Sequence, residues 1–107
     1  MAATYTEKRA ASGQLASSLT TIYTVPALTT ALLTQLWLYN TSTTVAQGIT
    51  IAINDGVDRT IATLTLQPLE YATVDLSGMA LNAADLLKSF TTTATTVNYA
   101  LSLVEKA

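Results

Sequence analysis

The sequence predicts an all-β fold in which two antiparallel sheets of about eight strands pack face to face as a sandwich. Short β-branched or aromatic runs are separated by turn residues about every 8 to 12 positions, the spacing typical of sandwiches and barrels. Of the 107 residues, 21 are threonines, whose branched side chains suit a pleated surface. Most of these runs also carry an apolar face, which must be buried against a second sheet.

The predicted strands are bounded by proline, glycine and asparagine, which interrupt a ladder or favour turns. They span residues 19–25, 30–39, 48–54, 59–66, 70–76, 86 onward and 97–104. The run 30–39 is apolar on both faces, so it is either central or covered by a partner on its second face. Asn82 could instead cap a helix, but we expect a short turn at 82–85 that leads into a strand from Leu86.

The predicted domain organisation is a short polar N-terminal arm over residues 1–13 followed by a β-sandwich domain over residues 14–107. Periodicity leaves the strand order open between a jelly-roll and an immunoglobulin-like arrangement, with a small barrel as the near alternative. The sequence has no apolar run of the length that a membrane span needs and no secretory signal, so we expect a soluble protein without membrane contact.

The amino-acid composition argues against most kinds of catalytic and ligand-binding site. The chain has no cysteine and no histidine, so it lacks thiol catalysis and the usual general base. Its four glycines are isolated, so no phosphate-binding loop is expected, and a net charge of −2 argues against nucleic-acid binding. Asp55 and Asp58 flank Gly56 in a pattern that suits a hairpin turn better than a calcium loop. We therefore predict no enzyme activity and no catalytic, cofactor or metal site.

The neutral surface of the chain indicates an interface instead. Only 11 % of the residues are charged, and none lies between residues 10 and 54. A surface of hydroxyl groups can pack against a partner without stranding ions. Aromatic residues in strands add to this expectation, although Trp37, Tyr39, Tyr71 and Tyr99 could also form a platform for sugar. Tyr5 and Tyr23 are expected to anchor onto a neighbouring subunit.

Two segments carry a resemblance to short β-sandwich proteins from the virion modules of tailed bacteriophages. They are IYTVPALTTA at 22–31 and QLWLYNT at 35–41, and a late turn follows at 82–85. The likeness extends over most of residues 14–104. Where the family pattern leads us to expect glycine, this chain has Leu28, Leu69 and Ala84. Those turns must either avoid positive φ or be held by contacts outside the domain.

The resemblance implies a virion protein, assembled in the host cytoplasm. Within that class we expect a capsid decoration or cement protein, a homotrimer that stabilises the head by binding between subunits of the major capsid protein. The alternatives are a tail, baseplate or fibre-associated sandwich and, from another class, a carbohydrate-binding module. The predicted contact residues are Tyr5, Tyr23, Leu28, Trp37, Tyr39 and Leu69.

Overall fold

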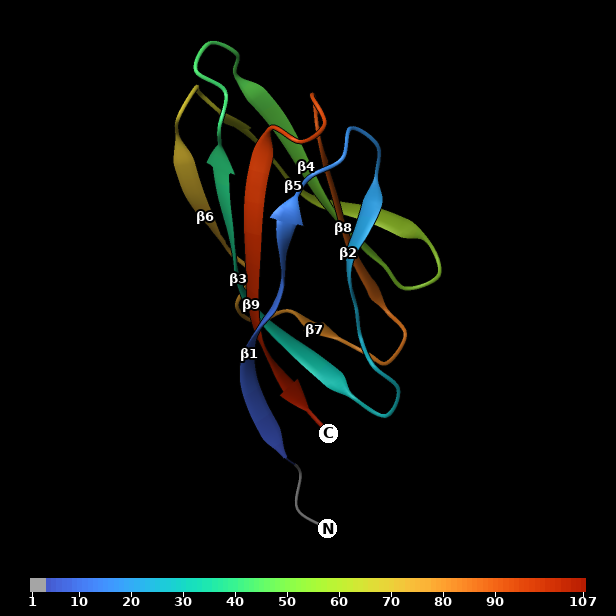
Figure 1. The fold of residues 1–107 in the computed structure, drawn as a ribbon. Coiled ribbons are helices and arrows are strands. Elements are labelled where there is room, and N and C mark those ends of the chain that lie inside the picture. The colour runs from blue at the N-terminus through green and yellow to red at the C-terminus, as the bar shows by residue number, and fades with distance from the viewer. Residues whose placement is uncertain (1–3) are drawn as a thin grey trace.

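The computed structural model describes residues 4–107 and contains two antiparallel sheets and no helix (Figure 1). The all-β sandwich prediction is confirmed. One sheet, here sheet A, has the strand order β1-β9-β3-β6, with β7 also pairing with β3; the other, sheet B, has the order β2-β8-β4-β5. The strands are β1 (Tyr5–Gln14), β2 (Thr20–Thr24), β3 (Thr30–Asn40), β4 (Gln47–Asn54), β5 (Asp58–Leu66), β6 (Tyr71–Asp75), β7 (Ala80–Leu81), β8 (Leu86–Thr91) and β9 (Val97–Lys106).

The strand order is that of a jelly roll. The pairs β4–β5, β3–β6, β2–β8 and β1–β9 are those of one long antiparallel ribbon folded at the β4–β5 turn and rolled so that successive pairs fall in alternate sheets. The turn that folds the ribbon is Asn-Asp-Gly, in which the Asn54 side chain accepts a hydrogen bond from the Gly56 amide at 2.9 Å. The structure thus selects one of the two strand orders that periodicity left open.

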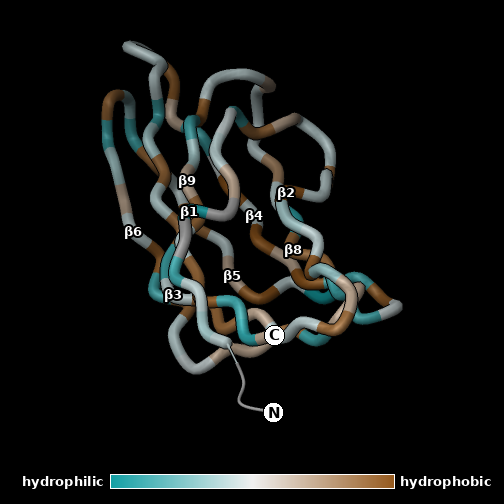
Figure 2. The backbone as a smooth tube through the Cα atoms, turned by 60° about the horizontal axis from the view of Figure 1, so that its bottom comes forward, coloured by the Kyte–Doolittle hydropathy of each residue, from teal (hydrophilic) through white to brown (hydrophobic). Residues whose placement is uncertain are grey.

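A single apolar core fills the space between the sheets. Its members are the inward side chains of alternating strand positions, and hydropathy changes accordingly from residue to residue along the strands (Figure 2). The fully buried large members include Leu15, Leu36, Leu38, Ile49, Ile51, Leu66, Leu87, Leu101 and Leu103. Leucine and isoleucine of this kind supply most of the driving force for folding, about 1.5 to 3 kcal/mol each on burial.

A β-bulge explains why β3 is apolar on both faces. The pairing of β3 with β9 shifts by one residue between Leu33 and Gln35, which leaves Thr34 as the extra residue. Leu33 and Leu36 both point into the core, although an unbroken alternation would place them on opposite faces. Simple alternation grouped Leu32 with Leu36, and that grouping is wrong, because Leu32 faces outward and is partly exposed.

The predicted N-terminal arm is, from Tyr5 on, an edge strand of sheet A. β1 pairs with β9 along nine positions, from Tyr5 opposite Lys106 to Gln14 opposite Asn98. Residues 1–3 of the predicted arm lie outside the described residues. Of the β1 side chains described, only Ala11 packs against the core, so β1 is held mainly through its backbone. Hydrophobic periodicity cannot detect such a strand, since neither of its faces is apolar.

The three turns in which glycine was expected do adopt positive φ. Leu28, Leu69 and Ala84 have φ values of 58°, 59° and 71°, in the left-handed region that favours glycine. The expectation that these turns avoid positive φ is therefore wrong. A left-handed backbone at a residue with a side chain costs about 1 to 2 kcal/mol at each position. Thr95, at 61°, is a fourth such residue, and nothing in its sequence context signalled it.

The turn at 82–85 forms as predicted. The Asp85 carboxylate accepts a hydrogen bond from the Asn82 amide at 2.9 Å, and the Asp85 amide donates to the Asn82 carbonyl at 3.0 Å. β8 begins directly afterwards at Leu86. Within residues 4–107, no helix is long and apolar enough to cross a membrane.

Candidate docking surface

Three aromatic side chains gather on the outer face of sheet A. Trp37 and Tyr39 alternate with core residues on β3, so both point away from the core, and their rings stack with centroids 6.1 Å apart and planes 13° apart. Tyr71 lies directly across from Tyr39 in the register of β3 with β6, and its side chain is 68 % exposed. Trp37 is 36 % exposed. We call Trp37, Tyr39 and Tyr71 the aromatic strip.

The two cross-strand rows that contain the aromatic strip are uncharged. In the row of Tyr39, β9 and β1 contribute Asn98 and Gln14, whose side-chain amides are hydrogen-bonded at 3.2 Å. In the row of Trp37, the neighbouring positions are Thr73, Ala100 and Ser12. None of these side chains is ionised, so a partner surface could cover the strip without burying an unpaired charge.

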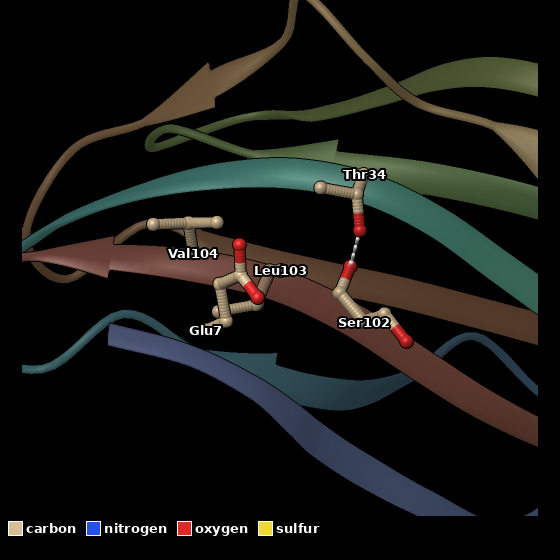
Figure 3. A pocket seen from close by; sticks show the side chains of 5 residues that line it. All are labelled: Glu7, Thr34, Ser102, Leu103 and Val104. Atoms are coloured by element: carbon tan, nitrogen blue, oxygen red, sulfur yellow. Dashed lines mark hydrogen bonds between the residues drawn. The ribbon is translucent and has the colours of Figure 1, made fainter. Parts of the chain in front are cut away.

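A hollow of about 430 Å³ lies further along the outer face of sheet A, beside the bulge of β3 (Figure 3). The Thr34 hydroxyl donates a hydrogen bond to the Ser102 carbonyl at 2.7 Å and is thereby engaged, while the Glu7 side chain lies beside Val104. The lining holds one carboxylate and no second titratable side chain. It therefore lacks the paired groups that acid–base chemistry needs.

The acidic turn between β4 and β5 is a hairpin, as its sequence predicted. The Asp55 carboxylate contacts the Arg59 guanidinium at 3.3 Å, and Asp58 contacts the Lys88 ammonium at 3.0 Å. Hydrogen bonds from the Asn54 side chain, first, and from Lys88 lower the pKa of Asp58. Among the described residues, no group of three or more His, Asp or Glu side chains is arranged to hold a metal ion.

Two surface aspartates make the stability of the fold sensitive to acid. Hydrogen bonds from Ser77 lower the pKa of Asp75, as those from Asn54 and Lys88 lower that of Asp58. A carboxyl whose pKa is lower in the folded chain stabilises the fold above the unfolded-state pKa, near 4, and this contribution is lost as the pH falls. With no histidine to titrate, we expect urea unfolding midpoints to stay level from about pH 5 to 8 and to fall below about pH 4. A marked change between pH 6 and 7 would contradict this account.

Tyr23 does not present its ring to a partner. The side chain is buried in the core, and its hydroxyl donates a hydrogen bond to the Glu105 carboxylate at 2.5 Å. Burial, together with this carboxylate, raises the pKa of Tyr23 above its usual range. The role predicted for Tyr23 as an anchor on another subunit therefore does not fit the structure, because the inward face of β2 is the face that the core covers. Tyr5 is exposed, with the Lys106 ammonium 5.9 Å from its ring centre.

The two predicted leucines lie at opposite ends of the sandwich. The Leu28 turn precedes the start of β3, whereas the Leu69 turn precedes β6, which pairs with the last residues of β3. The structure therefore brings together only Trp37 and Tyr39 among the predicted contact residues. Tyr71, which the sequence suggested only for sugar binding, joins them across the β3–β6 register. Val45 is also exposed, in a loop whose sequence has no periodicity and gave no signal.

The two ends of the sandwich also differ in charge. We call the end formed by the loops 15–19, 41–46, 67–70 and 92–96 the neutral pole, since Glu70 is the one ionisable side chain in these loops. We call the other end the charged pole. It carries the described ends of the chain and the turns 25–29, 55–57, 76–79 and 82–85, with Asp55, Asp85, Glu105 and Lys106 in or beside them.

Comparison with known proteins gives similarity in fold. No protein-family model matches this chain, and no curated protein matches it significantly in sequence. A chain from Bacillus endospore appendages, described as a family of disulfide-linked pili, is similar with a TM-score of 0.58 and 12 % identity, over 98 % of this chain and 89 % of that one. A chain from the acid-stable capsid of Helicobacter pylori bacteriophage KHP30 is similar with a TM-score of 0.50 and 11 % identity, over 97 % of this chain and 94 % of that one. At such identities, the likeness is one of fold.

Proposed function

We propose that this chain is a non-enzymatic structural subunit of a phage virion, and that it docks on the capsid through the outer face of sheet A. The observation that carries the proposal is the aromatic strip. A sheet of a free-standing sandwich is expected to have a polar outer face, yet here Trp37, Tyr39 and Tyr71 lie on that face among uncharged neighbours. Tryptophan and tyrosine are also the residue types most enriched among the dominant contacts of interfaces.

The fold comparisons support a role in assembly, since both similar structures belong to multi-subunit particles, a pilus and a phage capsid. The pili are described as disulfide-linked, whereas this chain has no cysteine, so its own assembly would rest on non-covalent packing. Within the virion we favour a decoration or cement protein, a trimer bound between subunits of the major capsid protein, over a tail, baseplate or fibre component. The low charge of the chain and its fold similarity to a phage capsid chain support this choice.

Removing the aromatic strip tests the proposal. We expect Trp37→Ala combined with Tyr71→Ala to weaken binding to capsids of the source virus by at least 100-fold, as judged by co-sedimentation, since each dominant interface contact contributes about 2 kcal/mol or more. The protein should still fold, because both rings lie outside the core, although loss of the Trp37–Tyr39 stack should lower the melting temperature by a few degrees. Val57→Ala, at an exposed residue of the β4–β5 turn, is the matched control and should bind normally.

Three outcomes would count against this assignment. Binding that survives loss of the strip would move the docking face elsewhere, and absence of the protein from heads in electron cryomicroscopy maps, with density on tails, would favour a tail role. Trp37 is the single tryptophan, so its fluorescence reports directly on the strip. A change on adding neutral oligosaccharides, with no capsid binding, would favour a carbohydrate-binding module.

A further inference from the structure

Leu28 combines two unfavourable features. Its side chain is 93 % exposed, and its backbone has a φ of 58°, where a branched residue is strained and glycine is not. Glycine at this turn would remove both the strain and the exposed apolar group. The remainder of the turn, Pro26, Ala27 and Thr29, is uncharged. The turn is therefore an uncharged apolar projection on the charged pole.

The neutral pole presents an apolar surface that could receive such a projection. Val45 and Leu69 are 51 % and 53 % exposed on two neighbouring loops. The loops are joined by a hydrogen bond from the Leu69 amide to the Ser42 carbonyl at 3.1 Å, and by the Asn40 side chain, which donates to the carbonyls of Val45 and Gln67. Leu69, like Leu28, holds a φ near 59°.

These two surfaces cannot meet within one chain. β3 separates the Leu28 turn from the neutral pole, and its 11 residues span about 35 Å at the usual rise per residue. The longest dimension of the described chain is 53 Å. A contact between the leucine at one end and the apolar loops at the other can therefore form only between different copies.

We propose that copies of this chain associate end to end, with Leu28 of one copy packed on Val45 and Leu69 of the next. The contact is heterologous, because the Leu28 turn of one copy meets the Val45 and Leu69 loops of the next. Since these two surfaces lie at opposite ends of the chain, repeating the contact gives a column rather than a closed dimer. Apolar contact suits the site, since the receiving loops contain a single carboxylate, Glu70. This contact does not use the aromatic strip and is independent of capsid docking.

A mixing experiment tests the contact. We expect the wild-type protein to show a sedimentation coefficient that rises with concentration up to about 1 mM, as small, transient interfaces require. Leu28→Asp and Leu69→Asp each keep one working end, and aspartate tolerates the left-handed region. Each variant alone should show a sedimentation coefficient that does not change with concentration, whereas their equimolar mixture should form a complex of one unit of each variant and stop there, because a single intact end-to-end contact remains available.

Three results of the sedimentation experiment would contradict the end-to-end contact. A wild-type sedimentation coefficient that stays constant up to about 1 mM, a single variant whose coefficient still rises with concentration, or a mixture that forms no larger complex would each overturn it. Leu28→Gly separates assembly from folding, since we expect it to raise the melting temperature while weakening association at least 10-fold. Retained association in Leu28→Gly would also overturn the role of this leucine. None of these results depends on capsid binding, so the docking proposal stands or fails separately.

Discussion

Asn40→Ala is expected to lower the free energy of unfolding by about 3 kcal/mol, one of the largest effects of any single change outside the apolar core. The Asn40 side chain is fully buried, and its amide nitrogen lies 2.9, 3.2 and 3.1 Å from the carbonyl oxygens of Val45, Leu66 and Gln67. Its oxygen accepts a hydrogen bond from the Ser42 amide at 2.9 Å. Alanine leaves these groups without their partner, and each unpaired buried polar group costs about 1 to 3 kcal/mol.

Asn40→Asp distinguishes hydrogen bonding from packing, because the two side chains have nearly the same shape. An ionised carboxylate would face three carbonyl oxygens, so the folded chain favours the protonated acid and raises the pKa of the new carboxyl. The loss of stability relative to the wild type should therefore be smallest below about pH 4 and should grow as the pH rises toward neutrality.

Urea denaturation measures the free energy of unfolding of both variants, and thermal denaturation measures their melting temperatures. A drop of about 12 to 20 °C in melting temperature should accompany Asn40→Ala, given the usual relation for a domain of this size. Asn98→Ala is the matched control: this asparagine makes an exposed side-chain hydrogen bond to Gln14, and its loss should change stability by less than about 0.5 kcal/mol. Equal effects at the two positions would show that the buried hydrogen bonds do not fix the loops of the neutral pole.

Glycine at all three left-handed turns, in Leu28→Gly, Leu69→Gly and Ala84→Gly combined, is expected to stabilise the fold by about 2 kcal/mol. Each position carries a left-handed backbone with a side chain, which costs about 1 to 2 kcal/mol. Glycine also gives the unfolded chain more freedom, which offsets about 0.4 to 1 kcal/mol at each site. The net gain should raise the melting temperature by about 10 °C.

A matched control separates backbone strain from a general effect of glycine. Ala46 is an exposed loop residue that is not in the left-handed region, so Ala46→Gly should destabilise by about 0.5 to 1 kcal/mol. The turns of Leu28 and Ala84 are connected, since the Ala84 amide donates to the Val25 carbonyl, so their effects need not add. A triple variant less stable than wild type would mean that contacts of the leucine side chains outweigh the strain.

The expected gain in stability from glycine bears on why leucine is present at residues 28 and 69. A chain in which glycine at Leu28 and Leu69 improves folding, yet which keeps leucine at both places, retains side chains that folding does not need. Exposed apolar groups maintained against strain are expected where a surface contacts a partner. The proposed docking and end-to-end contacts would give both the leucines and the aromatic strip a role that folding does not.

The sequence by itself determined the sandwich and most of its strands. In the predicted strands 70–76 and 97–104, every second residue is apolar, and Ala72 and Val74 of β6 and Leu101 and Leu103 of β9 pack on the core side. These predictions succeeded because the side-chain period of a strand is fixed and one face must be buried. The family resemblance marked three turns as glycine positions, and all three have positive φ, so the alternative that these turns avoid positive φ is wrong.

Tertiary structure alone decided the rest. Strand order, the bulge at Thr34 and the pairing of β1 depend on which strands form hydrogen bonds with each other. The periodicity of a single strand does not identify its partner strands. The same holds for the surface: Tyr23 and Tyr39 look alike along the chain, yet one is enclosed between the sheets while the other stacks on Trp37 outside them. Burial is a property of the assembled layers, so the division of the molecule into a neutral and a charged pole emerged only when four distant loops came together at one end.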